Sequence, residues 1–328
     1  MAEYAFCTLF NSLYLIRGIA LIESLRATQS QNPIYVLCMD TETYKVLCDL
    51  NLPQIQAIPL EKFLDSRLTQ IQKERGVGEF CWTCTPFLIE YVFKTSSFKR
   101  VIYLDADTYF FSDPDKILKQ WPLEQPLMLS RHRYLPEYDQ SKNSGIYCVQ
   151  FNGFDNSNAG KLALNWWKEK CADWCFNRVE PKRFGDQKYL DYIEDECQIS
   201  AYIPTHPGEG MAPWNSKDIH ISQIEKTPMV HVLGSSAVPA IYYHFHGLKL
   251  FYDSMVDLCL YYYVLPQTVL QYIYGPYVKH LAQISNQYGW DQKYDWLSDA
   301  EEHPKRTAKR QQLGTYYRYK IEDLLTAL

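Results

Sequence analysis

The stretch Arg100-Val101-Ile102-Tyr103-Leu104-Asp105-Ala106-Asp107 decides the fold class of this chain. After Arg100, the residues Val101–Leu104 form an apolar run without polar alternation, which is typical of a strand buried on both faces of a sheet. Runs of the same kind occur three times upstream (residues 4–10, 34–39 and 55–58). Apolar residues at helical spacing fill the segments between and after them (residues 13–28, 41–50, 60–73 and 85–95). Strands that alternate with helices predict an α/β fold with a parallel sheet, whose ligands bind at the carboxyl ends of the strands.

The composition excludes several classes of protein. With 328 residues, 47% hydrophobic and 22% charged, the chain is neither disordered, nor collagen-like, nor a small disulfide scaffold. Its 33 basic and 38 acidic residues give a net charge of −5, which argues against nucleic acid as a partner. Tyr is in excess, with 27 residues, and this indicates either binding of sugars or surfaces, or an aromatic core.

The sequence predicts a cytoplasmic protein. The N-terminus lacks a basic region, and no apolar run approaches the length of about 18 residues that a membrane span needs. The ten cysteines lie mostly in apolar runs and are expected to be reduced and buried. Two close pairs, Cys81/Cys84 and Cys171/Cys175, leave redox chemistry or a zinc site open as alternatives.

Two carboxylates follow the strand that ends at Leu104. Side chains alternate in extended chain, so Asp105 and Asp107 share one face while Ala106 faces away. Such a pair would repel unless a hard cation lies between the carboxylates, and Mg²⁺ or Mn²⁺ bridging to substrate phosphates fits this role. The alternative is a pair of solvated loop aspartates.

Two histidines occur in a strand-like stretch, residues 241–246. His244 and His246 are two residues apart and therefore share a face. A neutral imidazole can complete a metal site begun by two carboxylates, and we expect His244 to do so, with His246 as the second choice. An ordinary core or surface histidine is the alternative.

The run from Lys99 to Leu118 resembles the Asp-X-Asp region of family 8 glycosyltransferases, the glycogenin-like and lipopolysaccharide sugar transferases. Other segments resemble further motifs of that family (Thr8-Leu9-Phe10-Asn11, Asn143-Ser144-Gly145, Phe184-Gly185-Asp186-Gln187 and His244-Phe245-His246-Gly247). The resemblance implies a GT-A fold, a mixed and mostly parallel sheet sandwiched by helices. It also implies retaining transfer of a hexose from a nucleotide sugar, by default a UDP-hexose, to a saccharide or lipid-linked acceptor, with Mn²⁺ or Mg²⁺ as cofactor.

The same resemblance implies roles for individual residues. Five of them would bind the nucleotide, Tyr14 by stacking on the base and Lys249 by contacting the diphosphate (Thr8, Leu9, Asn11, Tyr14 and Lys249). Four would contact the rest of the donor (Asp105, Ala106, Asn143 and Ser144). Asp186 and Gln187 would lie under the sugar as the catalytic pair. Asp105, Asp107 and His244 would hold the metal.

The chain departs from the family pattern at two places. Lys249 lies two residues after Gly247, whereas relatives place their lysine three residues after the glycine. The segment 79–86 lacks the arginine that relatives carry, and Arg75 is a candidate substitute. Outside the motifs, Trp214 is expected either to stack on a sugar or to pack in the core. Residues 131–133 are expected either to clamp an anion or to form a solvated loop.

Two other functions compete with sugar transfer. Residues 101–108 also fit the pattern of Mg²⁺-dependent HAD-like phosphatases, in which Asp105 would be the phosphoryl-accepting nucleophile. In those enzymes the strand usually lies near the N-terminus, whereas here about 100 residues precede it. A non-catalytic sugar-binding protein of the same fold is the second alternative.

The sequence suggests two domains, a GT-A domain at 1–250 and a helical, Tyr-rich extension at 251–328. The extension holds 12 of the 27 tyrosines, and helices are expected at 251–264 and 268–287. Residues 303–320 carry six basic residues and no acidic one. This basic tail predicts one of two arrangements. Either the protein binds peripherally to the inner face of an anionic membrane, or the extension is a packed subdomain with a solvated tail.

Overall fold

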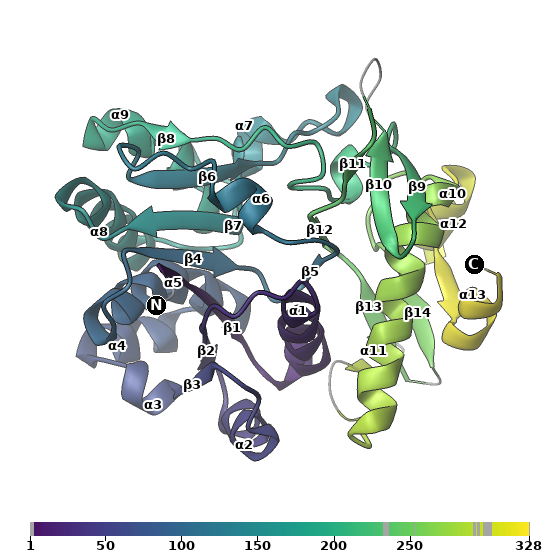
Figure 1. Ribbon diagram of the computed structural model, residues 1–328, viewed down its shortest axis with the longest axis horizontal. Helices are drawn as coiled ribbons and strands as arrows, with labels where there is room; N and C mark the ends of the chain where they lie inside the picture. The colour runs from purple at the N-terminus through teal and green to yellow at the C-terminus, as the bar shows by residue number, and fades with distance from the viewer. Residues whose placement is uncertain are drawn as a thin grey trace. The chain divides into compact units, whose positions relative to one another are not determined.

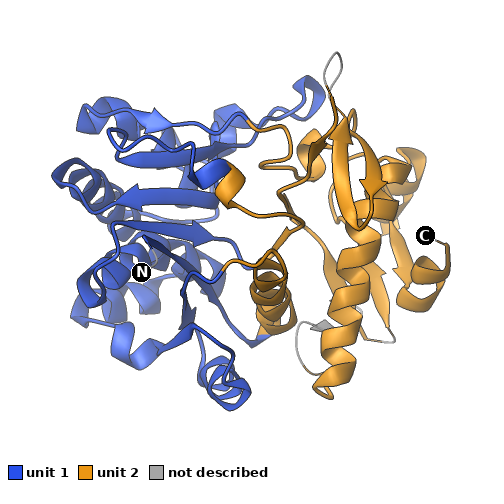
Figure 2. Cartoon of the chain, in the orientation of Figure 1, with its two compact units in different colours: residues 1–12, 31–106, 117–205 blue, residues 13–30, 107–116, 206–328 orange. Residues whose placement is uncertain are grey.

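The computed structural model describes residues 3–231, 236–252, 254–290, 293, 296–297 and 304–327. The chain divides into two compact units that are interleaved along the sequence (Figure 2). Unit 1 comprises residues 1–12, 31–106 and 117–205, and unit 2 comprises residues 13–30, 107–116 and 206–328. The sequence domains 1–250 and 251–328 group residues by family resemblance and remain a proposal.

Unit 1 is built on a seven-stranded sheet in the order β3-β2-β1-β4-β7-β6-β8 (Figure 1). Its strands are β1 (Tyr4–Phe10), β2 (Ile34–Cys38), β3 (Ile55–Pro59), β4 (Arg100–Leu104), β6 (Leu127–Arg131), β7 (Tyr147–Asp155) and β8 (Ala201–Tyr202). Only β7 runs antiparallel to its two neighbours, β4 and β6. The predicted fold class, α/β with a mixed and mostly parallel sheet, is confirmed.

Helices flank this sheet (Figure 1). They are α2 (Thr41–Leu50), α3 (Leu60–Phe63), α4 (Ser66–Glu74), α5 (Val77–Thr95), α7 (Ser141–Ser144), α8 (Asn158–Asp173) and α9 (Ile193–Cys197), with the 3-10 helices η2 (Pro136–Tyr138) and η3 (Gln187–Tyr192). Alternate residues of β1 and β4 face α5 and α8 and form one buried apolar cluster with them. The short helix α6 (Asp115–Leu118) contains residues of both units.

Two local predictions in unit 1 are wrong. The single helix expected at 60–73 is divided into α3 and α4, because the Asp65 carboxylate accepts the Leu68 N–H at 2.7 Å and starts a new helix. The loop expected at 74–79 is cut short by α5, which begins at Val77. There the Glu79 carboxylate accepts the N–H of Gly76 at 2.9 Å and caps the helix start.

Unit 2 contains small sheets and a second group of helices. Its strands are β5 (Thr108–Phe110), β9 (His220–Ile224), β10 (Thr227–His231), β11 (Val238–Pro239), β12 (Tyr242–His244), β13 (Lys249–Phe251), β14 (Met255–Asp257), β15 (Trp296–Leu297) and β16 (Arg318–Lys320). Its helices are α1 (Leu15–Ala27), α10 (Gln267–Val269), η4 (Pro213–Asn215), the π-helical turn η5 (Leu270–Tyr274), α11 (Gly275–Gln287), α12 (Pro304–Gln312) and α13 (Ile321–Ala327). The 3-10 turn η1 (Ser12–Tyr14) leads into α1.

Tyrosines form much of the core of unit 2. Tyr242, Tyr243, Tyr274 and Tyr277 are at most 1% exposed. The ring of Tyr277 stacks on Phe245 with centroids 3.7 Å apart. The tyrosine excess of the C-terminal third therefore reflects aromatic packing to a large extent.

The helix expected at 251–264 is wrong, whereas the helix expected at 268–287 is confirmed by α10, η5 and α11. Strands β13 and β14 form an antiparallel hairpin instead, with Phe251 opposite Met255. The turn places Ser254 at a φ of 56°, which a continuous helix does not allow. Among the described residues, no helix has the length and hydropathy needed to cross a bilayer.

Candidate active site

The β5–β12 ladder of unit 2 brings Asp107 and His244 together. His244 pairs with Thr108 in this antiparallel ladder, and the Phe245 N–H donates to the Asp107 carbonyl at 2.8 Å. The His244 N–H donates to the Met211 carbonyl at 2.8 Å and fixes the strand on its other side. The result is a contact of 3.1 Å between His244 Nε2 and Asp107 Oδ1.

Asp105, Asp107 and His244 present three ligand atoms within 4.8 Å of one another. An ion that binds each atom at about 2.0–2.3 Å requires separations of this size. Two carboxylate oxygens and an imidazole nitrogen also suit Mn²⁺ or Mg²⁺. The residues therefore fit the metal that the fold family implies, and among the described residues no other group of three ligands is as close.

The electrostatics of Asp107 favour its ionised form. Burial alone would raise the pKa of this carboxyl, but the charge and hydrogen bond of His244 outweigh it and hold the pKa well below its usual range. His246 and Arg17 contribute in the same direction. Asp107 is therefore a carboxylate ready to bind a cation.

Aromatic rings surround His244. Trp214 is 3% exposed and directs its ring toward both His244 and His246, with centroids 5.5 and 5.6 Å away. Of the two roles expected for Trp214, the packed one is found. Burial lowers the pKa of His246 to about 4, with His244 as a further cause, so His246 is neutral at physiological pH.

Tyr14 and Lys249, both expected at the nucleotide, lie together in unit 2. The Lys249 ammonium is 5.6 Å from the centroid of the Tyr14 ring. The Arg17 guanidinium is 4.5 Å from the same centroid. Arg17 is 2% exposed, and sequence analysis missed it. The only signal was a cation in the otherwise apolar start of α1.

The remaining nucleotide residues lie on unit 1. Thr8 and Leu9 are buried in β1, and the Thr8 hydroxyl has no hydrogen-bond partner. Asn11 directly follows the strand and is partly exposed. Ala106, 7% exposed, follows Asp105 beyond the end of β4. Their contacts with a donor stay predictions.

The predicted sugar-binding residues of unit 1 are held by one ion pair. Asn143 and Ser144 belong to α7, and Lys188 ties this helix down by donating to the Ser141 carbonyl at 2.7 Å and to Asp191 at 2.8 Å. The Asp191 carboxylate also accepts the Ile146 N–H at 2.7 Å. The turn at 141–146 is thus bound to η3, the helix that Gln187 begins.

Asp186 is 4% exposed, and its Oδ2 has no hydrogen-bond partner. Burial raises the pKa of this carboxyl to about 8, and the negative charge of Asp105 contributes to the rise. Asp186 is therefore protonated at neutral pH and can donate a hydrogen bond, unlike Asp107.

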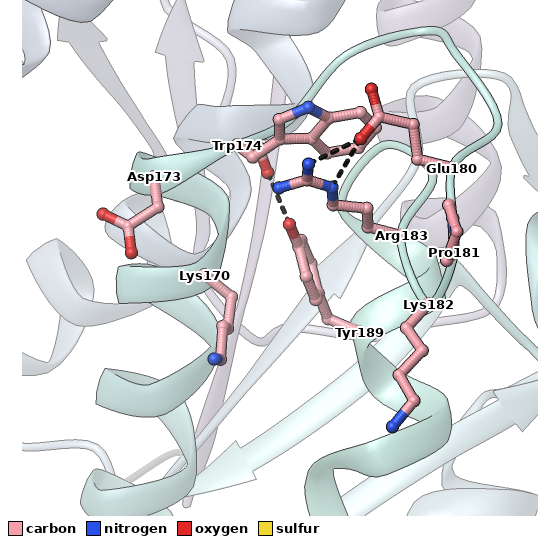
Figure 3. Close-up of a pocket in the computed structure, with 8 residues that line it drawn as sticks. All are labelled: Lys170, Asp173, Trp174, Glu180, Pro181, Lys182, Arg183 and Tyr189. Carbon is pink, nitrogen blue, oxygen red and sulfur yellow. Dashed lines mark hydrogen bonds and ion pairs between the residues drawn. The ribbon is translucent and has the colours of Figure 1, made fainter.

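A polar pocket in unit 1 lies apart from these predicted residues (Figure 3). It is lined by Lys170, Asp173, Trp174, Glu180, Pro181, Lys182, Arg183 and Tyr189. Of these lining residues, the Arg183 guanidinium lies 4.7 Å from the centroid of the Trp174 ring and pairs with Glu180. None of the residues predicted for the donor or the metal lines it.

Arg75 and the paired cysteines have structural surroundings. Arg75 donates to the carbonyls of Cys171 and Ala172 at 2.6 Å, so it closes the C-terminal end of α8. Burial raises the pKa of Cys81 to about 12 and raises that of Cys84, which makes these thiols poor nucleophiles. Among the described residues, these cysteines are not part of a three-ligand metal cluster.

Comparison with known proteins finds matches to a family model, to protein sequences and to solved structures. A family model described as "Mannosyltransferase putative" matches residues 7–146. Uncharacterized protein YfnF of Bacillus subtilis (strain 168) is 31% identical over 253 residues, which cover 75% of this chain and 82% of YfnF. The galactosyltransferase LgtC, solved with donor and acceptor sugar analogues, has a TM-score of 0.50 at 12% identity, over 85% of this chain and 95% of that one. The apo glycosyltransferase GlyE of Streptococcus pneumoniae TIGR4 has a TM-score of 0.40 at 18% identity, over 61% of this chain and 45% of GlyE.

The likeness to LgtC shows the fold alone, and that fold is the GT-A fold predicted above. The chain spans less than half the length of GlyE. The phosphatase alternative has no support among these findings.

Proposed function

Because this chain belongs to the family of the Bacillus subtilis protein YfnF and is a glycosyltransferase of the GT-A type, we propose that it transfers a hexose from a nucleoside diphosphate sugar to a saccharide or lipid-linked acceptor. The observation that carries the proposal is the set of Asp105, Asp107 and His244, with ligand atoms within 4.8 Å of one another. We place the reaction in the cytoplasm and take Mn²⁺ or Mg²⁺ as the metal.

In this proposal the three ligands would hold the divalent ion, which when bound would stabilise the charge of the leaving diphosphate as a Lewis acid. Tyr14 stacks on the base, while Arg17 and Lys249, the two cations beside its ring, offset the phosphate charge. Asp107 is ionised at neutral pH and would therefore offer a charged oxygen to the ion. Uridine is our expectation for the base.

On the sugar side, Asn143 and Ser144 position the hexose, and Asp186 and Gln187 face the reacting carbon. The buried carboxyl of Asp186, which keeps its proton at neutral pH, can donate a hydrogen bond to a sugar hydroxyl. The ion pair of Lys188 and Asp191 keeps these groups in place. We propose retention of the anomeric configuration for this reaction.

The decisive test is a screen of UDP- and GDP-linked hexoses for Mn²⁺-dependent release of nucleoside diphosphate. GDP-mannose belongs in the screen because the matching family is described by mannosyl transfer. We expect one donor to be turned over, and Asp107→Asn to lower kcat/KM by about 10²-fold or more, because it removes a charged ligand.

Donor binding and phosphomonoester hydrolysis, measured beside the screen, separate the alternatives. Binding of a donor without any release would favour a non-catalytic sugar-binding protein. Phosphate release from a simple phosphomonoester that depends on Asp105 would favour the phosphatase and contradict the proposal. If no nucleotide sugar is bound or consumed, the transferase proposal fails.

A further inference from the structure

Tyr261, a residue outside the family motifs, packs on the turn that follows the metal ligand His244. Its ring stacks on His246 with centroids 4.8 Å apart and planes 13° from parallel. Next to it, the Leu260 N–H donates to the Gly247 carbonyl at 3.1 Å. One segment therefore contacts the turn His244–Gly247 through both its backbone and a ring.

Gly247 shows how closely the ring fits. The residue has a φ of +83°, and a Cβ built there would lie 2.7 Å from Cδ2 of Tyr261. The ring and the turn are complementary to a degree that excludes even a methyl group.

The Tyr261 segment is itself held from behind by α12. Arg310 is fully buried and forms a double ion pair with Asp257, at 2.7 and 2.8 Å. Its guanidinium also donates to the Cys259 carbonyl at 2.7 Å, and Arg306 donates to the Leu260 carbonyl. The backbone at 257–260 is thus fixed between α12 on one side and the His244–Gly247 turn on the other.

We propose that Tyr261 is a positioning residue for the metal site, acting through His246 and Gly247 to hold the His244 imidazole beside Asp107. The proposal rests on the proposed function only in taking His244 as a metal ligand. In this proposal the C-terminal segment contributes to the metal site, because it supplies the ring that packs on the turn His244–Gly247. Outer partners of this kind orient ligands, and their loss weakens metal binding.

The test measures Mn²⁺ binding directly, from the electron paramagnetic resonance signal of free Mn²⁺ in titrations of the full chain. We expect Tyr261→Ala to raise the Kd for Mn²⁺ roughly tenfold. Tyr261→Phe keeps the stacked ring and should bind within about twofold of the unaltered chain. Tyr261→Leu, which fills the volume without a flat ring, serves if Tyr261→Ala does not fold.

Tyr262 provides the matched control. Tyr262 is 38% exposed, against 40% for Tyr261. Its ring centroid lies 4.8 Å from the Lys309 ammonium, whereas the ring of Tyr261 stacks on His246. Tyr262→Ala should leave the Kd for Mn²⁺ unchanged. An equal weakening by Tyr262→Ala, unchanged binding by both Tyr261→Ala and Tyr261→Leu, or a change in acceptor KM alone would overturn the proposal.

The outcome is separable from that of the proposed function. If no sugar is transferred but Mn²⁺ binds in a Tyr261-dependent way, the positioning role stands and the transferase proposal fails. If the unaltered chain binds no Mn²⁺ at millimolar concentration, the positioning role fails as well.

Discussion

At the scale of the residue, Asp107 and Asp186 show how environment gives two carboxyls different tasks. Asp107 is stabilised as a carboxylate by His244, whereas Asp186 is buried near Asp105 and keeps its proton to a pKa of about 8. Groups with pKa values driven apart in this way commonly divide the work of a site. Here one carboxyl is ready to bind a cation and another to donate a hydrogen bond.

Asp186 makes stability depend on pH. An aspartate in the unfolded chain ionises near pH 4, but the folded chain holds the proton until about pH 8. Between these values the folded state binds one more proton, so this residue lowers the free energy of unfolding as pH rises, by up to about 1.4 kcal/mol per pH unit. Asp186→Asn removes this pH-dependent loss of stability, because an amide does not ionise. We therefore expect it to raise Tm relative to the unaltered chain, more at pH 8 than at pH 5.

The comparison is made by calorimetry with a metal chelator present. Ser285→Ala is a suitable reference, because its buried hydroxyl also lacks a partner but does not titrate. A difference in Tm between Asp186→Asn and the unaltered chain that is the same at pH 5 and pH 8 would contradict the assignment.

At the scale of the element, helix α12 depends on one buried cation. Arg310 satisfies Asp257 and two backbone carbonyls inside the protein. Arg310→Met would leave the Asp257 carboxylate buried without its partner, at a cost of about 3–5 kcal/mol in the free energy of unfolding. Replacing both residues, as Asp257→Leu with Arg310→Met, should recover most of this loss.

Denaturation in urea, followed by fluorescence and circular dichroism, checks this prediction. Lys309→Met on the same helix is the control, since Lys309 makes an exposed contact with Tyr262 and should change stability by less than about 0.5 kcal/mol. A double variant as unstable as Arg310→Met alone would show that the pair is not the cause.

Elements were predictable from the sequence where local pattern decides them. The bounds of β1, β4 and α2 agree with expectation because their apolar spacing and caps lie within the segment itself. The hairpin of β13 and β14 was missed because β14 also pairs with β16, more than 60 residues later in the chain. Aromatic runs such as 261–263 do not distinguish a helix from a packed loop.

The residues of the candidate site likewise fall into those that the sequence predicted and those that it did not. The structure brings Asp105, Asp107 and His244 together, as the family resemblance implied. Arg17 and Tyr261 were missed, because their contacts arise from how α1 and the segment after β14 pack within unit 2. No spacing along the chain encodes those contacts.

At the scale of the whole molecule, the net charge of −5 and the basic tail pose one question, namely whether the chain adheres to anionic lipid. At least four of the six basic residues of the tail contact other parts of unit 2. Arg310 is buried, Arg306 donates to the Leu260 carbonyl, Lys309 lies over Tyr262, and the Arg318 guanidinium is 4.5 Å from the centroid of the Phe251 ring. These bases stabilise the packing of the C-terminal segment.

We therefore expect no salt-sensitive membrane binding. Of the two alternatives that the sequence left open, these contacts favour the packed subdomain. Even at an anionic surface, Lys305 and Lys320 would contribute only about 1 kcal/mol each, and the acidic remainder of the chain opposes them. Flotation with phosphatidylserine-containing vesicles at low salt should leave the protein in the dense fraction. Flotation that is lost at high salt and in Lys320→Glu would instead show that the tail is a membrane anchor, because this substitution reverses an exposed charge without touching the Arg310–Asp257 pair.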